Sequence, residues 1–196
     1  MGYRSNITTG SLKVRESRII ADLMLREIYG AQWNKAILVD NVLQTRSVET
    51  ARRLSQLIKS RLSLMHDDFW RLIRDGSMEV AVHATFSAAV EHSTLLGDFM
   101  DLVMRQEYRI FTPKLSTKMW EPYIEGCRGR DPEMPEWNQS TIKRLRSSVF
   151  QMLAEAGYLK SSRSLELQSV HFAGEVLRCL EKHNENYVLR CVTICS

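Results

Sequence analysis

The stretch MEVAVHATFSAAVEH, residues 78–92, decides the fold predicted from this sequence. Small and apolar residues occupy nearly every position, so little of a helix formed here would be polar. A helix that is apolar on all sides lies in a protein core. The weakly polar run from 80 to 90 is interrupted by His83, Thr85 and Ser87, and it falls far short of the ~20 apolar residues of a membrane span. We therefore expect a buried central helix and no membrane segment.

Amphipathic helices are predicted on both sides of this central segment. Their apolar residues recur every three to four positions, which is the helical period. Gly157 follows one of them as a C-terminal stop. The predicted fold class is mainly α, a compact multi-helix fold with helix-turn-helix elements. The other predicted helices span 11–29, 33–43, 48–64, 66–74, 95–106, 116–125, 138–156 and 175–182.

Three segments are predicted to be extended. Residues 108–113 end in a proline, and the residue before a proline avoids the helical region. Residues 158–170 resemble a small, wing-like β-hairpin with its turn at 161–164. Residues 187–194 are rich in β-branched side chains and are expected to form a final strand.

One linker is predicted, at 126–137, where two glycines and two prolines gather. It separates an N-terminal helical bundle, 1–125, which contains the first helix-turn-helix, from a winged-helix-like part, 138–196. We expect the two parts to pack as one globular unit. A chain of 196 residues usually forms one domain or two small ones.

The composition is that of a soluble globular protein, with 44% hydrophobic and 26% charged residues. These values argue against disorder. No Cys-x-x-Cys pair and no secretory signal occur, so the thiols are expected to be reduced in a cytoplasm. The four cysteines are Cys127, Cys179, Cys191 and Cys195.

Positive charge is concentrated in two windows, although the whole chain carries only +4, from 27 basic and 23 acidic residues. Residues 35–65 hold six basic and two acidic residues. Residues 137–163 hold five basic residues and one acidic residue. The remainder of the chain is therefore net negative. Such segregation indicates an acidic partner, with nucleic acid the first candidate.

The first basic window predicts a helix-turn-helix over 34–64, with a four-residue turn at 44–47. Ser47 can cap the start of the second helix. The negative charge of Glu49 in its first turn is favourable at the positive end of the helix dipole. Short hydroxyls, arginines and a glutamine on the polar face are typical of a DNA recognition helix. A solvated amphipathic helix in a bundle is the alternative. The predicted DNA-binding residues are Arg46, Ser47, Thr50, Arg52, Arg53, Gln56 and Lys59.

The second window places a basic helix directly before the predicted hairpin. This is the layout of a winged helix-turn-helix, whose wing reaches the backbone or the minor groove. A bundle helix with incidental surface charge is the alternative. The predicted DNA-binding residues are Ser140, Thr141, Lys143, Arg144 and Arg146 on the helix, with Lys160 and Arg163 on the hairpin.

Catalysis and metal binding are not predicted. No nucleophile elbow, glycine-rich phosphate loop or His-Glu-x-x-His motif occurs. The histidines form no pair at i and i+4, and the Cys191–Cys195 pair has no second pair to complete a zinc site. Asp98 and Asp101 can share a helix face, but like-charged neighbours are common on solvated helices. We expect no enzyme activity, no metal and no cofactor.

Four segments, in the same order, resemble the BrxA family, small core proteins of BREX phage-defence loci. They are RSNITTGSL at 4–12, NVLQ to TARR at 41–53, HSTLLGDF at 92–99, and WNQST to LAEAGY at 137–158. Together they extend over almost the whole chain. The tail after His183, with Cys191 and Cys195, matches no pattern of the family and is assigned no role.

This resemblance implies a mostly helical fold related to the antitermination factor NusB, with helix-turn-helix elements that bind double-stranded DNA. It implies a non-enzymatic role beside methyltransferase, ATPase and phosphatase-like BREX proteins. By position, the DNA-facing residues fall on 46–59 and 140–146. RNA binding of the NusB type, and a protein–protein adaptor with basic faces on acidic BREX proteins, are the alternatives.

Overall fold

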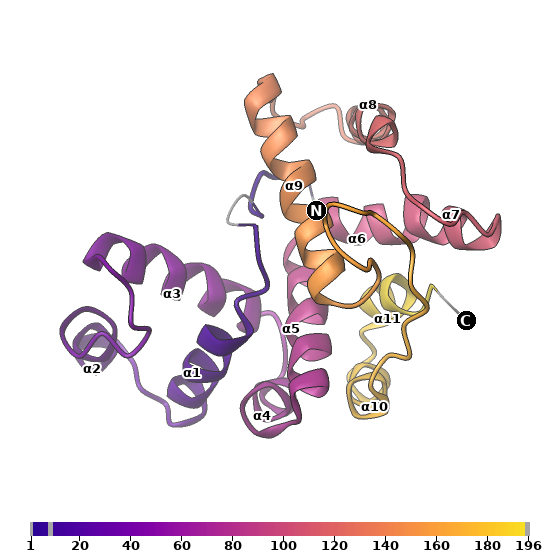
Figure 1. Ribbon diagram of the computed structural model, residues 1–196. Helices are drawn as coiled ribbons and strands as arrows, with labels where there is room; N and C mark the ends of the chain where they lie inside the picture. Colours follow the sequence, from indigo (N-terminus) through magenta and orange to yellow (C-terminus); the bar gives the residue numbers. More distant parts are fainter. Residues whose placement is uncertain (1, 8–9, 195–196) are drawn as a thin grey trace. The chain divides into compact units, whose positions relative to one another are not determined.

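A computed structural model describes residues 2–7 and 10–194 (Figure 1). Every named element in this part of the chain is a helix, which confirms the mainly α prediction. The chain divides into two compact units, and one of the boundaries between them falls within a helix, α5 (Met78–His92). The first unit contains the described residues of 1–12, 89–172 and 185–194, and the second contains 13–88 and 173–184.

The second unit is an assembly of helices in which α1 packs on α4 and α3, and α10 packs on α4. Its core side chains are fully buried, as for Ile20 of α1, Ile58 of α3 and Phe69 of α4. The helices are α1 (Val14–Leu25), α2 (Gly30–Asn34), the π-helix η1 (Lys35–Val39), α3 (Val48–Leu62), α4 (Asp67–Asp75), α10 (Gly174–Lys182) and residues 78–88 of α5.

His83 explains how α10, distant in sequence, joins this unit. Its ring is buried in α5, and Nδ1 accepts a hydrogen bond of 3.0 Å from the backbone N–H of Ala173. Ala173 is the residue just before α10, where backbone N–H groups lack partners within the helix. The polar His83 in the apolar helix α5 thus accepts a hydrogen bond from a backbone N–H group at the start of α10, which would otherwise lack a partner.

The first unit is built around an aromatic cluster of Phe99, Trp120, Tyr123 and Phe150, with ring centroids 5.1 to 6.3 Å apart. The indole N–H of Trp120 donates to the carbonyl of Ile142 at 3.1 Å. Besides residues 89–92 of α5, the helices are α6 (Thr94–Asp98), the π-helix η2 (Phe99–Met104), α7 (Arg105–Arg109), the 3-10 helix η3 (Thr117–Met119), α8 (Trp120–Arg130), α9 (Gln139–Glu155) and α11 (Asn186–Val192).

The predicted final strand, 187–194, is wrong, because residues 186–192 form the helix α11. Val188, Cys191 and Val192 are buried, and their spacing of three and four positions is helical. Burial of this face overrides the β preference of its valines, since strand propensity depends on packing context.

The predicted wing is also wrong, since residues 158–170 contain no strand. Antiparallel pairing within the segment is limited to one bridge, between Leu159 and Leu167. Leu165 adopts a left-handed backbone conformation, with φ of 56°, and donates its N–H to the carbonyl of Ser161. This turn ends the pairing, because a strand requires extended backbone at each residue.

Two further boundaries differ from the prediction. Residues 108–109 belong to α7, and Phe111 takes a left-handed conformation, so 108–113 is not an extended segment. The predicted linker, 126–137, begins inside α8, which continues to Arg130. Its residues lie within the first unit rather than at a boundary between units. The glycines at 126 and 129 are tolerated there as helical residues.

Candidate nucleic-acid interface

Helix α3 buries one face and exposes its basic face. Ala51, Ile58 and Leu62 are each 1% exposed, which fixes the rotation of the helix about its axis. Arg52 and Arg53 consequently lie on the exposed side. The predicted polar residue Gln56 is exposed beside them.

The start of α3 is capped as predicted. The Ser47 hydroxyl accepts a hydrogen bond of 3.2 Å from the Thr50 N–H and donates to the Thr50 hydroxyl at 2.9 Å. Ser47, Thr50 and Arg46 are all exposed. The positive end of the helix dipole therefore faces solvent together with an arginine.

Lys59, also predicted to bind DNA, differs from its neighbours because it is half-buried. Its ammonium group lies 4.5 Å from the centre of the Trp33 ring and 5.3 Å from that of Tyr29. These cation–π contacts occupy the side chain that was expected to face a phosphate.

The turn before α3 is longer than predicted. The preceding helical residues end at Val39, so the connection spans residues 40–47 rather than 44–47. Asn41 and Gln44 adopt left-handed conformations, with φ of 45° and 53°, which are incompatible with a continuing helix. The Asn41 side chain closes the loop by accepting from the Thr45 N–H at 3.0 Å.

Helix α9 also exposes basic residues near a capped start. The cap is Asn138, whose side-chain oxygen accepts from the Thr141 N–H at 2.9 Å and from the Ser140 hydroxyl at 2.7 Å. Burial of Ile142, Leu145 and Val149 orients the helix. Ser140, Lys143 and Arg144 are then exposed, whereas Thr141 and Arg146 are half-buried.

The loop after α9 contributes one available cation. Lys160 is exposed, but its ammonium pairs with the Glu166 carboxylate at 2.9 Å. Arg163 is exposed in the turn. The neighbouring Ser162 hydroxyl donates to Gln151 of α9 at 3.0 Å, which ties this turn to the helix.

Most of the predicted DNA-binding bases form no ion pair with any described residue, a property they share with some other exposed bases such as Arg109 and Lys118. Arg71, Arg105 and Arg190 each form ion pairs with aspartates. Within residues 2–7 and 10–194, no ion pair is formed by the following predicted residues: Arg46, Arg52, Arg53, Lys143, Arg144, Arg146 and Arg163. Their charge is therefore not offset by a carboxylate of the described chain.

Asp98 and Asp101, considered above as paired carboxylates, hold helices together. Asp98 accepts hydrogen bonds from the hydroxyls of Tyr3, at 2.5 Å, and Tyr187, at 2.9 Å. Asp101 pairs with Arg105 at 3.1 Å and with Arg190 at 3.0 Å. Both carboxylates thus anchor α11 and neighbouring segments of the first unit.

The sequence profile of the BrxA family matches residues 1–184. This chain belongs to the BrxA family. It is 50% identical over 192 residues to "BREX protein BrxA" of Paramagnetospirillum magneticum, covering 98% of this chain and 96% of the relative. It is 31% identical over 173 residues to "BREX protein BrxA" of Escherichia coli O9:H4, covering 88% and 81%.

The fold of this BrxA-family chain is similar to that in a crystal structure of an uncharacterized protein from Magnetospirillum magneticum. The TM-score is 0.92 at 47% identity, over 99% of this chain and 100% of the other. The family places the chain in BREX phage-defence systems, and the names of these relatives specify no enzyme activity. Among the described residues, no helix combines the length and apolar character needed to cross a bilayer.

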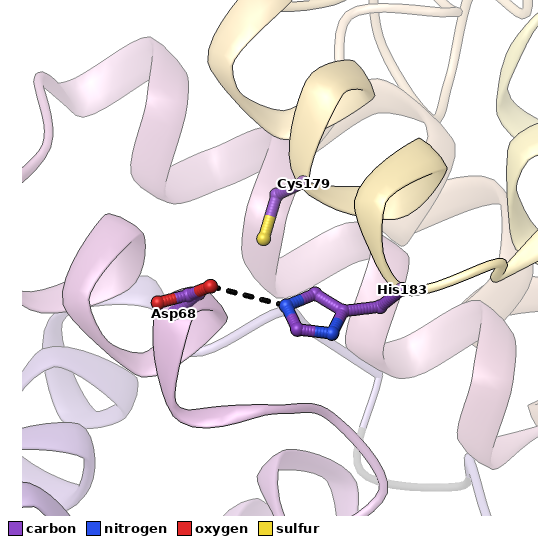
Figure 2. A group of neighbouring side chains, drawn as sticks. All are labelled: Asp68, Cys179 and His183. Atoms are coloured by element: carbon purple, nitrogen blue, oxygen red, sulfur yellow. Dashed lines mark hydrogen bonds and ion pairs between the residues drawn. The ribbon is translucent and has the colours of Figure 1, made fainter.

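Sequence reasoning missed one cluster of side chains, in the second unit. Asp68, Cys179 and His183 bring a carboxylate oxygen, a sulfur and a ring nitrogen within 4.8 Å of one another (Figure 2). The sequence signal is Cys-x-x-x-His at 179–183. His–His and Cys–Cys spacings alone, on which the metal-site prediction was based, miss this mixed pair of Cys179 and His183. Cys127, Cys179 and Cys191 form no disulfide, and Cys195 lies outside the described residues.

Proposed function

We propose that this chain is a non-catalytic, double-stranded DNA-binding accessory protein of a BREX phage-defence system, acting in the cytoplasm. The observation that carries the proposal is the set of exposed basic side chains near the capped starts of α3 and α9, which pair with no carboxylate in the described ranges. Membership of a phage-defence family supports a nucleic-acid partner.

Phosphate contacts account for most of the expected affinity. Arginine and lysine side chains neutralise phosphates, and N–H groups at a helix start favour anions. The side chains assigned to this role on α3 and directly before it are Arg46, Ser47, Thr50, Arg52, Arg53 and Gln56. Those on α9 and the following loop are Ser140, Thr141, Lys143, Arg144, Arg146 and Arg163. Few of them can reach base edges, so we expect weak sequence preference.

A protein–protein adaptor is the second candidate. Phe111 is 90% exposed and the adjacent Ile110 is 57% exposed, at the end of α7. Exposed large apolar side chains that lie together are typical of protein-interaction sites. In this case the basic helices would bind acidic BREX proteins, and the isolated chain would ignore DNA.

Fluorescence anisotropy of a labelled DNA duplex, titrated with the purified chain at about 50 and about 200 mM salt, tests the proposal. We expect binding that weakens with salt, with a log–log slope of roughly −0.9 per phosphate neutralised. An unlabelled RNA duplex of equal length serves as competitor, and stronger competition by RNA would favour the RNA alternative. Absence of binding at the lower salt concentration would reject DNA binding and favour the adaptor.

A further inference from the structure

The Asp68–Cys179–His183 cluster has the geometry of a metal site. The Asp68 carboxylate oxygen and His183 Nε2 are 3.1 Å apart, and both lie within 4.8 Å of the Cys179 sulfur (Figure 2). In tetrahedral zinc sites with bonds of about 2.0 to 2.3 Å, neighbouring donor atoms are roughly 3.3 to 3.6 Å apart. Small side-chain movements would therefore place all three donors on one ion.

Two helices supply these donors. Cys179 lies in α10 and His183 directly follows that helix, four residues later, so both side chains project from the same side. Asp68 lies in the first turn of α4, on which α10 packs. Thiolate, imidazole and carboxylate are together a donor set that suits zinc.

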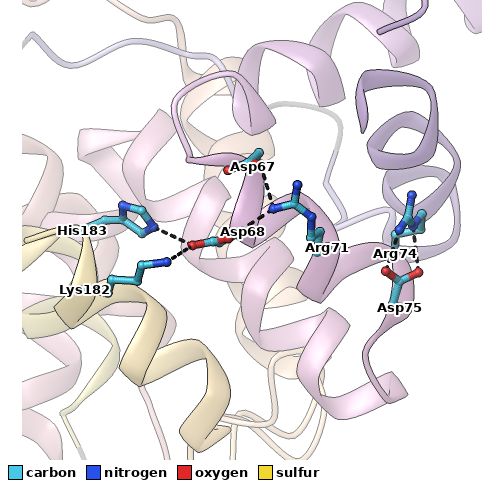
Figure 3. Close-up of polar contacts among 7 residues, drawn as sticks. All are labelled: Asp67, Asp68, Arg71, Arg74, Asp75, Lys182 and His183. Carbon is cyan, nitrogen blue, oxygen red and sulfur yellow. Dashed lines mark hydrogen bonds and ion pairs between the residues drawn. The ribbon is translucent and has the colours of Figure 1, made fainter. Parts of the chain in front are cut away.

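The surroundings hold the donors in place. Arg71 donates to the other Asp68 oxygen at 3.2 Å (Figure 3). The His66 ring stacks on the His183 ring, with centroids 3.8 Å apart and planes inclined by 15°. Such supporting contacts orient the ligands in known metal sites. Cys179 is 7% exposed, and the side chains of His183 and Asp68 are 16% and 31% exposed, so the sulfur and the imidazole are better shielded from bulk water than the carboxylate.

A cavity of about 340 Å³ lies beside Asp68 and Cys179, and Glu175 and Lys182 also line it. It is large enough for a water molecule as fourth ligand. Lys182 is the competitor for the carboxylate: its ammonium lies 2.5 Å from Asp68 Oδ2, on a side chain that is 66% exposed.

We propose that Asp68, Cys179 and His183 bind one Zn²⁺ ion, with water as the fourth ligand, and that the ion fastens α10 to α4. Binding forms a zinc–sulfur bond and releases the Cys179 thiol proton to solvent, while His183 binds as neutral imidazole. Thiolate and carboxylate together balance the charge of the ion. Lys182 then leaves Asp68 and turns to solvent.

Cobalt(II), a spectroscopic substitute for zinc, tests the site in the full chain after treatment with a chelator and a thiol-free reductant. We expect one equivalent to bind, with a thiolate charge-transfer band in the near ultraviolet that zinc abolishes by displacement. Cys179→Ser should lose this band. Asp68→Asn and His183→Gln should weaken binding about tenfold or more.

Lys182→Met provides the sharper test, because it removes an exposed competing cation without removing a ligand. Cobalt affinity should rise about two- to fivefold, the range expected for an exposed ion pair. Cys127→Ala and His171→Gln are the matched controls, and each should leave cobalt affinity unchanged. Zinc should also raise the Tm of the wild-type chain and not that of Cys179→Ser.

An unchanged band in Cys179→Ser, or no saturable binding by the wild type, would overturn the proposal. Weaker binding by Lys182→Met would contradict the competition between lysine and metal. Circular dichroism of each variant distinguishes a lost ligand from a lost fold. Because the site is independent of α3 and α9, DNA binding and metal binding can fail separately.

Discussion

Gly97 lies directly against the hydroxyl of Tyr187. A Cβ atom placed on Gly97 would overlap the phenol of that tyrosine. This close approach lets the Tyr187 hydroxyl donate to Asp98 at 2.9 Å. Because Gly97 of α6 has no side chain, Tyr187 of α11 can pack directly against α6. The contact joins two segments of the first unit that are 90 positions apart in the sequence.

Gly97→Ala is expected to destabilise the chain by about 1–3 kcal/mol, because the added methyl group displaces a packed tyrosine. Thermal unfolding followed by circular dichroism measures the loss. Gly129→Ala is the control, since nothing lies within 4 Å of its added Cβ. An alanine there should be neutral or stabilising by up to about 1 kcal/mol. Equal effects of the two variants would show that Gly97 has no special role.

Charge reversal on either basic helix should weaken DNA binding without unfolding the chain. Arg52→Glu with Arg53→Glu changes α3, and Lys143→Glu with Arg144→Glu changes α9. Each pair should lower affinity by about tenfold or more at low salt and reduce the salt slope by roughly 1 to 2. Anisotropy at several salt concentrations measures both quantities.

The matched control for these pairs is Arg109→Glu with Lys118→Glu, two exposed bases outside the proposed interface. It changes the net charge by the same amount. If the control weakens binding as much as the α3 and α9 pairs do, total charge rather than these helices governs affinity. Unchanged affinity in both test pairs would reject the assignment of both faces.

Asn138→Ala should cost about 1 kcal/mol, because it leaves the Thr141 N–H at the start of α9 without its side-chain acceptor. In a chain of this size the expected fall in Tm is about 2–4 °C. Asn138→Asp, which keeps an acceptor oxygen, should retain most of the stability. Ser140→Ala should cost less than Asn138→Ala. The reverse order would make Ser140 the true cap.

Stability should fall at alkaline pH. Burial raises the pKa of the Cys191 thiol to about 12 and raises that of the Tyr187 phenol well above its usual range. Well below pH about 8.5, the usual pKa of a cysteine thiol, Cys191 is protonated in both the folded and the unfolded chain, and pH has little effect on stability through this group. Above that pKa, the unfolded chain loses the Cys191 proton while the folded chain keeps it, so rising pH favours unfolding.

Tm measured at pH about 8 and about 10.5 tests this expectation. Cys191→Ala removes the titrating thiol and should reduce the loss of Tm between the two pH values. An equally steep loss in this variant would show that the thiol does not contribute. The buried tyrosines would then account for the alkaline effect.

Local patterns in the sequence were sufficient for most of the helices. The apolar run at 78–92 predicts α5 with its observed bounds, and the period of 48–64 predicts α3 to within two residues. The cap at Ser47 was predicted as well. These features depend on contacts between residues three or four positions apart, and a linear pattern records such contacts directly.

Segments whose conformation depends on distant partners were predicted wrongly. Residues 187–194 have strand propensity, yet residues 186–192 form α11 because Val188 and Val192 are buried on one helical face. The hairpin at 158–170 fails at the left-handed Leu165, whose carbonyl accepts from the Leu115 N–H outside the segment. Local propensity does not reveal the burial of the α11 face or the hydrogen bond between Leu115 and Leu165.

The sequence alone determined that the chain is mainly helical, that its basic residues are concentrated near two helix starts, and that it resembles the BrxA family. Which bases remain unpaired depends on the tertiary structure, which also brings Asp68 next to Cys179 and His183. The physical reason is distance along the chain. Helix period and capping act over one turn, whereas the Asp68–Cys179–His183 cluster joins residues more than a hundred positions apart.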